Sequence, residues 1–171
     1  MLRRIVAVAL LVTFVSPHVL SAVDGDKAAY FGGTVAAFAD AKEPVEGLLD
    51  TRNEEALILT AEKKPYAGQA LRIPYARILE IEYGQKAGRR VGTAVATTVL
   101  LGPIGLISLL SKKRKHYVTI GFKDAADKDQ VAVIELGKDI VRTTLPIIQT
   151  RSGKAIEYQD DEARKASRGS E

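Results

Sequence analysis

The chain has 171 residues, of which 46% are apolar and 27% charged, proportions typical of a folded protein rather than a disordered one. This length is enough for one domain with a core of its own. The formal net charge is +4, or +2 without Arg3 and Arg4, which is too small to indicate a nucleic-acid partner. Cysteine is absent, which excludes disulfides, thiolate metal sites, cysteine nucleophiles and a lipid anchor on cysteine.

Residues 1–22 have the pattern of a secretory signal. A basic start precedes an apolar run of 11 residues, Ile5–Val15, and Pro17 then breaks the helix before small residues. We expect cleavage after Ala22, with Ser21 as a near alternative. A retained anchor is the other interpretation, although as a helix the uninterrupted run would cover only ~17 Å of ~30 Å of hydrocarbon. Both interpretations predict export to the periplasm or cell envelope of a bacterial-type cell.

Residues 23–29 are expected to lead into seven short strands, each with alternating or β-branched apolar residues. In the fifth strand, Glu80 and Glu82 are predicted to share a solvated face opposite Leu79, Ile81 and Tyr83. Asp124–Asp129 is expected to be a polar hairpin loop before the seventh. The predicted strands are Gly33–Phe38, Val45–Asp50, Ala56–Thr60, Ala70–Tyr75, Ile78–Gly84, His116–Phe122 and Gln130–Leu136.

A helix is predicted after the last strand, because Ile140, Val141, Thr144, Leu145 and Ile148 recur at one-face spacing. Gly153 supplies a stop signal for this helix. Pro146 removes one of its internal hydrogen bonds and favours a kink. Residues 157–171 are mostly charged or small, which predicts a solvated, disordered tail.

Two stretches carry a resemblance to a known superfold. They are Arg72-Ile-Pro-Tyr-Ala-Arg-Ile78, before the fifth strand, and Glu135-Leu-Gly-Lys-Asp139, which leads into a helix ending Gln149–Lys154. With seven strands before one amphipathic helix, the chain resembles the bacterial pleckstrin-homology-like (PH-like, GRAM-like) superfold over residues 30–158, apart from an insertion. The resemblance implies a mainly β fold, a small seven-stranded antiparallel barrel or sandwich capped by a C-terminal α-helix, in a single domain over 23–156. The superfold hosts many functions, so it predicts no activity.

The insertion, residues 86–115, is the most informative part of the sequence. Val91–Leu110 is a run of 20 residues without a charge, which as a helix would measure ~30 Å, the thickness of a bilayer core. If the flanking strands belong to one small barrel, however, both ends of the run lie on the same side and a single crossing would separate the strands. Gly102, Pro103 and Gly105 instead predict the bend of an apolar helical hairpin, with arms of ~10–16 Å that dip into one leaflet.

Basic residues flank the run at both ends, which favours a hairpin whose two ends both lie among anionic headgroups. A spanning helix usually carries its basic excess on the cytoplasmic side alone. At ~1 kcal/mol per basic residue near a strongly anionic surface, the seven flanking residues would add several kcal/mol to the binding. The residues predicted to contact the membrane are Lys86, Arg89, Arg90, Val99, Leu100, Leu101, Ile104, Leu106, Ile107, Leu109, Leu110, Lys112, Lys113, Arg114 and Lys115.

Three other interpretations of this run stay open. The hairpin can fold onto the body of the protein as ordinary core. It can pair with a second copy of the chain, because Gly88, Gly92 and Ala96 form a small-residue stripe suited to close helix contact. It can also be a true single span, if the predicted barrel is wrong.

The sequence does not predict an enzyme. Outside the signal, His116 is the only histidine, and its place beside four basic residues predicts an interfacial or solvated side chain. The serines outside the signal do not lie in a strand–turn–helix elbow. Asp124–Asp129 lacks the glycine and the distal glutamate of a calcium loop, so a hairpin turn is favoured there.

We therefore expect a non-enzymatic envelope protein, a membrane-associated binding or scaffolding module moored by the basic-flanked apolar loop. Anionic lipid is the expected partner, with a protein partner or self-association as a further interaction; no cofactor, metal or nucleic acid is expected. The alternatives are a single-pass membrane protein and a soluble structural subunit that self-associates through the hairpin. An enzyme with an unfamiliar carboxylate site is the weakest hypothesis.

Overall fold

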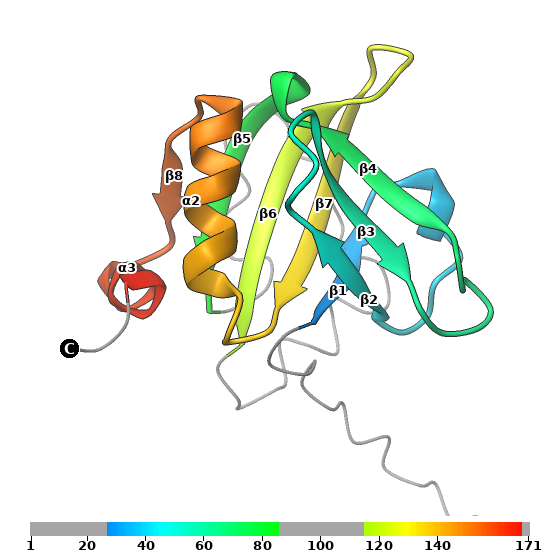
Figure 1. Cartoon of the computed structure of the whole chain (residues 1–171), viewed down its shortest axis with the longest axis horizontal. Helices are drawn as coiled ribbons and strands as arrows, with labels where there is room; N and C mark the ends of the chain where they lie inside the picture. The colour runs from blue at the N-terminus through cyan, green and yellow to red at the C-terminus, as the bar shows by residue number, and fades with distance from the viewer. Residues whose placement is uncertain (1–26, 86–114, 169–171) are drawn as a thin grey trace, which may run out of the picture.

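The computed structural model describes residues 27–85 and 115–168, which form one curled, mixed sheet of eight strands and two C-terminal α-helices (Figure 1). The strand order is β4-β3-β2-β1-β7-β6-β5-β8, and every neighbouring pair is antiparallel except β5 and β8. The strands are β1 (Ala28–Gly33), β2 (Val45–Asp50), β3 (Ala56–Ala61), β4 (Ala70–Pro74), β5 (Ile78–Gly84), β6 (His116–Lys123), β7 (Asp129–Leu136) and β8 (Ile156–Tyr158). The helices are α2 (Val141–Ser152) and α3 (Asp161–Arg168), with short 3-10 turns η1 (Ala36–Phe38) and η2 (Tyr75–Arg77).

Strand β1 joins the two halves of the sheet, because it pairs with β2 on one side and with β7 on the other. The sheet curls about this strand, so that β2, β3 and β4 cross over the same face of β6 and β7 on which α2 lies (Figure 1). We call this the inner face of β1, β5, β6 and β7, and the opposite one the outer face. The result is a half-barrel with α2 along its open side.

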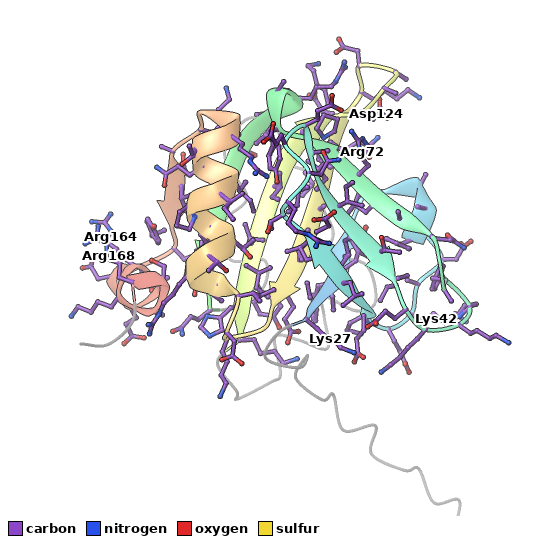
Figure 2. All side chains as sticks on the ribbon, viewed as in Figure 1. Lys27, Lys42, Arg72, Asp124, Arg164 and Arg168 are labelled. Atoms are coloured by element: carbon purple, nitrogen blue, oxygen red, sulfur yellow. The ribbon has the colours of Figure 1, made fainter. Side chains whose placement is uncertain are left out.

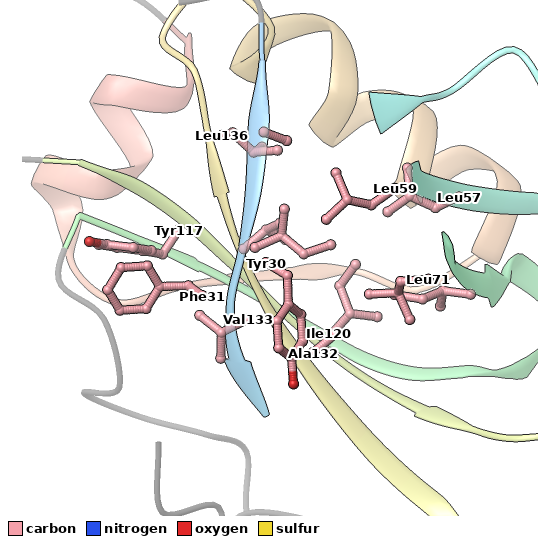
Figure 3. Close-up of a cluster of buried hydrophobic side chains, with 14 of the residues drawn as sticks. Tyr30, Phe31, Leu57, Leu59, Leu71, Tyr117, Ile120, Ala132, Val133 and Leu136 are labelled. Atoms are coloured by element: carbon pink, nitrogen blue, oxygen red, sulfur yellow. The ribbon is translucent and has the colours of Figure 1, made fainter. Parts of the chain in front are cut away.

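Both faces of β6 and β7 are buried, which explains their nearly continuous apolar sequences. Figure 3 separates the two sides of β1. Tyr30 lies on the inner side with Leu57, Leu59 and Leu71, whereas Phe31, Tyr117 and Val133 lie on the outer side. The outer side is therefore apolar as well, although α2 does not cover it.

Helix α2 packs through Val141, Thr144, Leu145 and Ile148, all buried. It ends at Gly153, whose left-handed backbone (φ 67°) closes the last turn with an N–H···O bond of 2.9 Å to the Gln149 carbonyl. Arg151 donates hydrogen bonds to the carbonyls of Thr51 and Asn53, and its guanidinium lies 5.4 Å from the centre of the Tyr75 ring. The helix is thereby held to the β2–β3 loop and to η2.

Several predictions from the sequence are confirmed. The chain is mainly β, the predicted second and fifth strands match β2 and β5, and the predicted helix is α2. The polar loop joins β6 and β7 as a hairpin, in which the Asp124 carboxylate accepts hydrogen bonds from the backbone N–H groups of Ala126 and Lys128. These bonds hold the pKa of Asp124 below its ordinary value, the bond from Lys128 contributing most.

The predicted first strand, Gly33–Phe38, is wrong. Strand β1 lies earlier, at Ala28–Gly33, and η1 occupies the second half of the predicted range. Residues 28–32 are buried on both faces, so they lack the alternation by which a half-exposed strand is recognised. Gly33 ends the strand with φ 132°, and a Cβ there would lie 2.0 Å from the Val131 carbonyl oxygen.

The predicted disordered tail is also wrong over most of its length, and the strand count is eight rather than seven. Residues 156–158 form β8 beside β5, and 161–168 form α3. The Asp160 carboxylate caps α3 by accepting a hydrogen bond of 2.7 Å from the N–H of Ala163, whose side chain is fully buried. Acidic residues in the first turn and basic ones in the last suit the helix dipole.

The predicted solvated face of β5 needs correction. Glu82 is buried and Glu80 half-buried, whereas Leu79, predicted to face the core, is exposed. The reason is a bulge: Ile78 pairs with Phe122 but Glu80 with Gly121, so Leu79 is the extra residue. Beyond the bulge, the glutamates lie on the outer face, which is covered rather than solvated.

We predict that Leu145→Ala destabilises the protein by about 2–5 kcal/mol, because the side chain is 2% exposed and its removal leaves a cavity under α2. Leu48→Ala is the matched control, since Leu48 is 54% exposed and its loss is expected to cost less than about 1 kcal/mol. Urea unfolding of both variants measures the two values. Equal losses would contradict the packing of α2 described here.

Candidate functional site: the end of the sheet that carries the apolar insertion

Three of the four ends of the described segments, 27–85 and 115–168, lie at one end of the sheet, which we call the root end. Strand β5 ends where β6 begins, since Gly84 pairs with Tyr117. Strand β1 begins beside the same place, because Ala28 and His116 both pair with Leu136. Lys27 thus lies at the root end, and Asp124 in the β6–β7 hairpin lies at the opposite end (Figure 2).

The two strands that flank the insertion share one sheet, as the sequence predicted. The residues that border the insertion, Gln85 and His116, therefore lie side by side at the root end. The signal 1–22, the predicted hairpin with its bend at Gly102, Pro103 and Gly105, and the predicted membrane-contacting residues from Lys86 to Arg114 lie outside the described residues.

Lys115 is the one predicted membrane-contacting residue that the structure describes. Its side chain is 4% exposed, and its Nζ lies 3.0 Å from Oε2 of Glu135, whose side chain is 3% exposed. In this conformation Lys115 is turned into the protein and does not belong to a basic surface. The sequence could not show this, because the pairing of Glu135 with Tyr117 places the carboxylate beside Lys115 only once β6 and β7 are aligned.

His116, predicted to be interfacial or solvated, is half-buried. Its Nδ1 shares a hydrogen bond of 2.6 Å with the Tyr83 hydroxyl, and the two rings are stacked with centroids 6.2 Å apart. Burial lowers the pKa of His116, and the charge of Glu135 opposes this shift. Burial has the opposite effect on the Tyr83 hydroxyl, whose pKa it raises, with a further contribution from Tyr158.

Tyr83, Lys115, His116 and Glu135, which we call the root cluster, tie β5, β6 and β7 together where the insertion leaves the sheet. Aromatic contacts extend the cluster to both faces: Tyr83 packs edge-on against Tyr158 at 6.1 Å, and Tyr117 against Phe31 at 5.0 Å. A buried ion pair and a partly buried hydrogen bond of this kind fix register and orientation. The arrangement is suited to holding the two ends of the insertion in a fixed position.

Two of the clefts on the surface of the described residues lie outside the root cluster. The larger, about 410 Å³, is formed by the chain between η1 and β2 and by the β3–β4 turn. Its charged side chains are three acidic and three basic ones, Asp40, Glu43, Glu46, Lys42, Lys63 and Lys64, and Lys63 pairs with Glu46. It therefore presents no single sign of charge to a ligand. The smaller, about 240 Å³, lies between β4 and the β6–β7 hairpin.

Comparisons with protein-family models, curated proteins and solved structures gave no match to this chain. Within residues 27–85 and 115–168, neither α2 nor α3 has the length and apolar character that crossing a bilayer demands. The same residues contain no group of three or more His, Asp or Glu side chains placed to hold a metal ion.

Breaking the buried ion pair should be costly. We predict that Lys115→Met destabilises the protein by about 3–5 kcal/mol, because it leaves the Glu135 carboxylate buried without its ammonium partner. The double variant Lys115→Met/Glu135→Leu should recover most of this loss. Arg72→Met, which breaks the exposed pair with Glu55, is the control and should cost less than about 1 kcal/mol. Urea unfolding of the three variants checks this; similar losses for the two single variants would show that the Lys115 pair is not buried in solution.

The lowered pKa of His116 predicts a pH dependence of stability. As pH falls through the ordinary value of 6.5, the unfolded chain takes up a proton at His116 that the folded protein still lacks. Stability is therefore lost as pH falls from above 6.5 toward the lower pKa of the folded state. We expect His116→Gln to lose less stability than the wild type between about pH 7.5 and about pH 5.5. Urea midpoints across this range measure the difference, and parallel profiles would contradict a buried, neutral His116.

Proposed function

We propose that the protein is an exported, non-enzymatic envelope module, a PH-like half-barrel held at an anionic membrane surface by the apolar run Val91–Leu110. The observation that carries this proposal is the geometry of the root end. Two segments that the sequence predicts to meet membranes, the N-terminal signal region and the insertion, both join the described sheet there. One bilayer facing the root end is therefore within reach of both.

The pairing of β5 with β6 argues against a single crossing by the insertion. Gly84 and Tyr117 are register partners, so the chain before and after the insertion starts from one place on one side of any membrane. A single span would require these strands to lie in different compartments. A segment that enters and leaves one leaflet meets the constraint without breaking the sheet.

Electrostatic attraction supports the same orientation. With Lys115 paired to Glu135, six basic residues of the predicted set remain: Lys86, Arg89, Arg90, Lys112, Lys113 and Arg114. Six residues at ~1 kcal/mol each at a strongly anionic surface still add several kcal/mol. This part of the binding weakens as ionic strength rises, whereas burial of the apolar run does not.

The strand order supports the PH-like assignment within this proposal. β1 to β7 follow one another as neighbours apart from the β4–β5 break, β1 pairs with β7, and a helix packs on the open side next in sequence. Strand β8 and helix α3 are additions to that plan. A soluble subunit that self-associates through the same apolar run is the second candidate, favoured by the small-residue stripe Gly88, Gly92 and Ala96.

The test is flotation of the purified full chain with vesicles of neutral lipid or of neutral lipid mixed with an anionic one. We expect flotation with the anionic vesicles, weakened by salt, and loss of flotation when Leu100, Leu101, Leu106 and Ile107 are all changed to serine. Leu48→Ser is the matched control, because this exposed leucine lies on β2 and not in the insertion, and it should float like the wild type.

The outcome also separates the two candidates. Equal flotation of the wild type and the fourfold serine variant would refute mooring by the apolar run. Absence of flotation together with a stable oligomer in lipid-free size measurement, dispersed by the fourfold variant, would favour the self-associating subunit instead.

A further inference from the structure

The outer face of the sheet is apolar and buried, although α2 and strands β2–β4 lie on the inner face. Phe31, Val131 and Val133 have no exposed surface, and Tyr117 and Thr119 are also buried. These side chains come from three neighbouring strands, β1, β7 and β6, and Figure 3 shows Phe31, Tyr117 and Val133 grouped on one side of β1. Apolar residues gathered on a sheet face need an occupant that excludes water from them.

From this buried face we infer that Val91–Leu110 of the same chain docks on the outer face, over Phe31, Tyr117 and Val133, when no membrane is present. This inference rests on the proposed function in one respect: the bilayer and the outer face compete for the same segment. Two observations select this occupant over a second copy of the chain.

The first is position and length. The insertion that contains the segment joins β5 to β6, two strands of this face, and both attachment points lie at the root end. Strand β6 has eight residues and is about 26 Å long. Each arm of the predicted hairpin is ~10–16 Å, so the pair reaches the middle of the face, where Thr119 lies, without leaving the sheet.

The second is charge. Glu80 and Glu82 lie along the outer face of β5, and Glu157 of β8 is the register partner of Glu82. Lys86, Arg89 and Arg90 follow directly after β5 in the sequence. A segment that folds back along this face brings its basic start toward these three carboxylates. Burial raises the pKa of Glu80, with a smaller contribution from Glu157, and a nearby cation would oppose this shift.

Cysteine cross-linking tests the docking in the lipid-free full chain, which has no cysteine of its own. Thr119→Cys is combined in turn with Val95→Cys, Val99→Cys, Leu106→Cys or Leu109→Cys, and the chain is oxidised and mapped by mass spectrometry. Thr60→Cys is the matched control, because Thr60 is exposed on β3. We expect at least one Thr119→Cys pair to give about 10-fold more intramolecular disulfide than its Thr60→Cys counterpart, since the bond requires Cβ atoms within about 4.5 Å.

Equal yields for Thr119→Cys and Thr60→Cys would overturn the docking. So would disulfides formed only between two chains, which would assign the outer face to a second copy. Flotation of the same variants reports separately on the membrane role. Flotation without cross-linking would support the proposed function and overturn the docking. Cross-linking without flotation would support the docking and overturn the proposed function.

Discussion

The antiparallel pairing of β5 with β6 is the constraint on which the rest of this molecule depends. It joins residues on either side of the insertion, Gly84 and Tyr117, and fixes both ends of a long apolar segment at one edge of a folded sheet. Closing so long a loop is entropically unfavourable. The pairing of β5 with β6 and of β6 with β7, which offsets this cost, runs along the whole strands rather than at the root end alone. Whatever the insertion does, it acts from that one place.

The root cluster shows how the sheet maintains this arrangement. An ion pair as buried as Lys115–Glu135 adds little net stability compared with apolar packing, because both charges have lost their water. Its contribution is specificity, since any slip of β6 against β7 would leave one or both charges buried and unpaired. The hydrogen bond between Tyr83 and His116 imposes the same requirement on β5 against β6. Register is thus specified most strongly next to the long insertion, where loop entropy would otherwise loosen it.

The strands that could be predicted from the sequence alternate or are rich in β-branched residues, and they include β6 and β7, which are buried on both faces. β2 and β5 alternate or are bounded by turn residues, and α2 shows an apolar stripe with a glycine stop. β1 was missed because its sequence, Ala-Ala-Tyr-Phe-Gly-Gly, neither alternates nor contains a β-branched residue. α3 was missed because a charged composition outweighed the capping signal of Asp160. At the candidate site, the shared sheet was predictable from the strand pattern. The inward turn of Lys115 was not, since it depends on a partner 20 residues away.

The two destinations proposed for Val91–Leu110 differ less in hydrophobicity than in electrostatics. Both destinations remove the same apolar side chains from water, so the free energy gained by burying apolar surface is nearly the same on the sheet face and in the bilayer. The difference lies in the charges around the basic residues that flank the segment. On the sheet face these are a few carboxylates of β5 and β8, whereas at the membrane they form a continuous anionic surface. The larger number of anionic groups favours the bilayer at low ionic strength, and screening by salt removes that advantage first. Lipid charge and salt, rather than the apolar sequence itself, therefore decide where the segment lies.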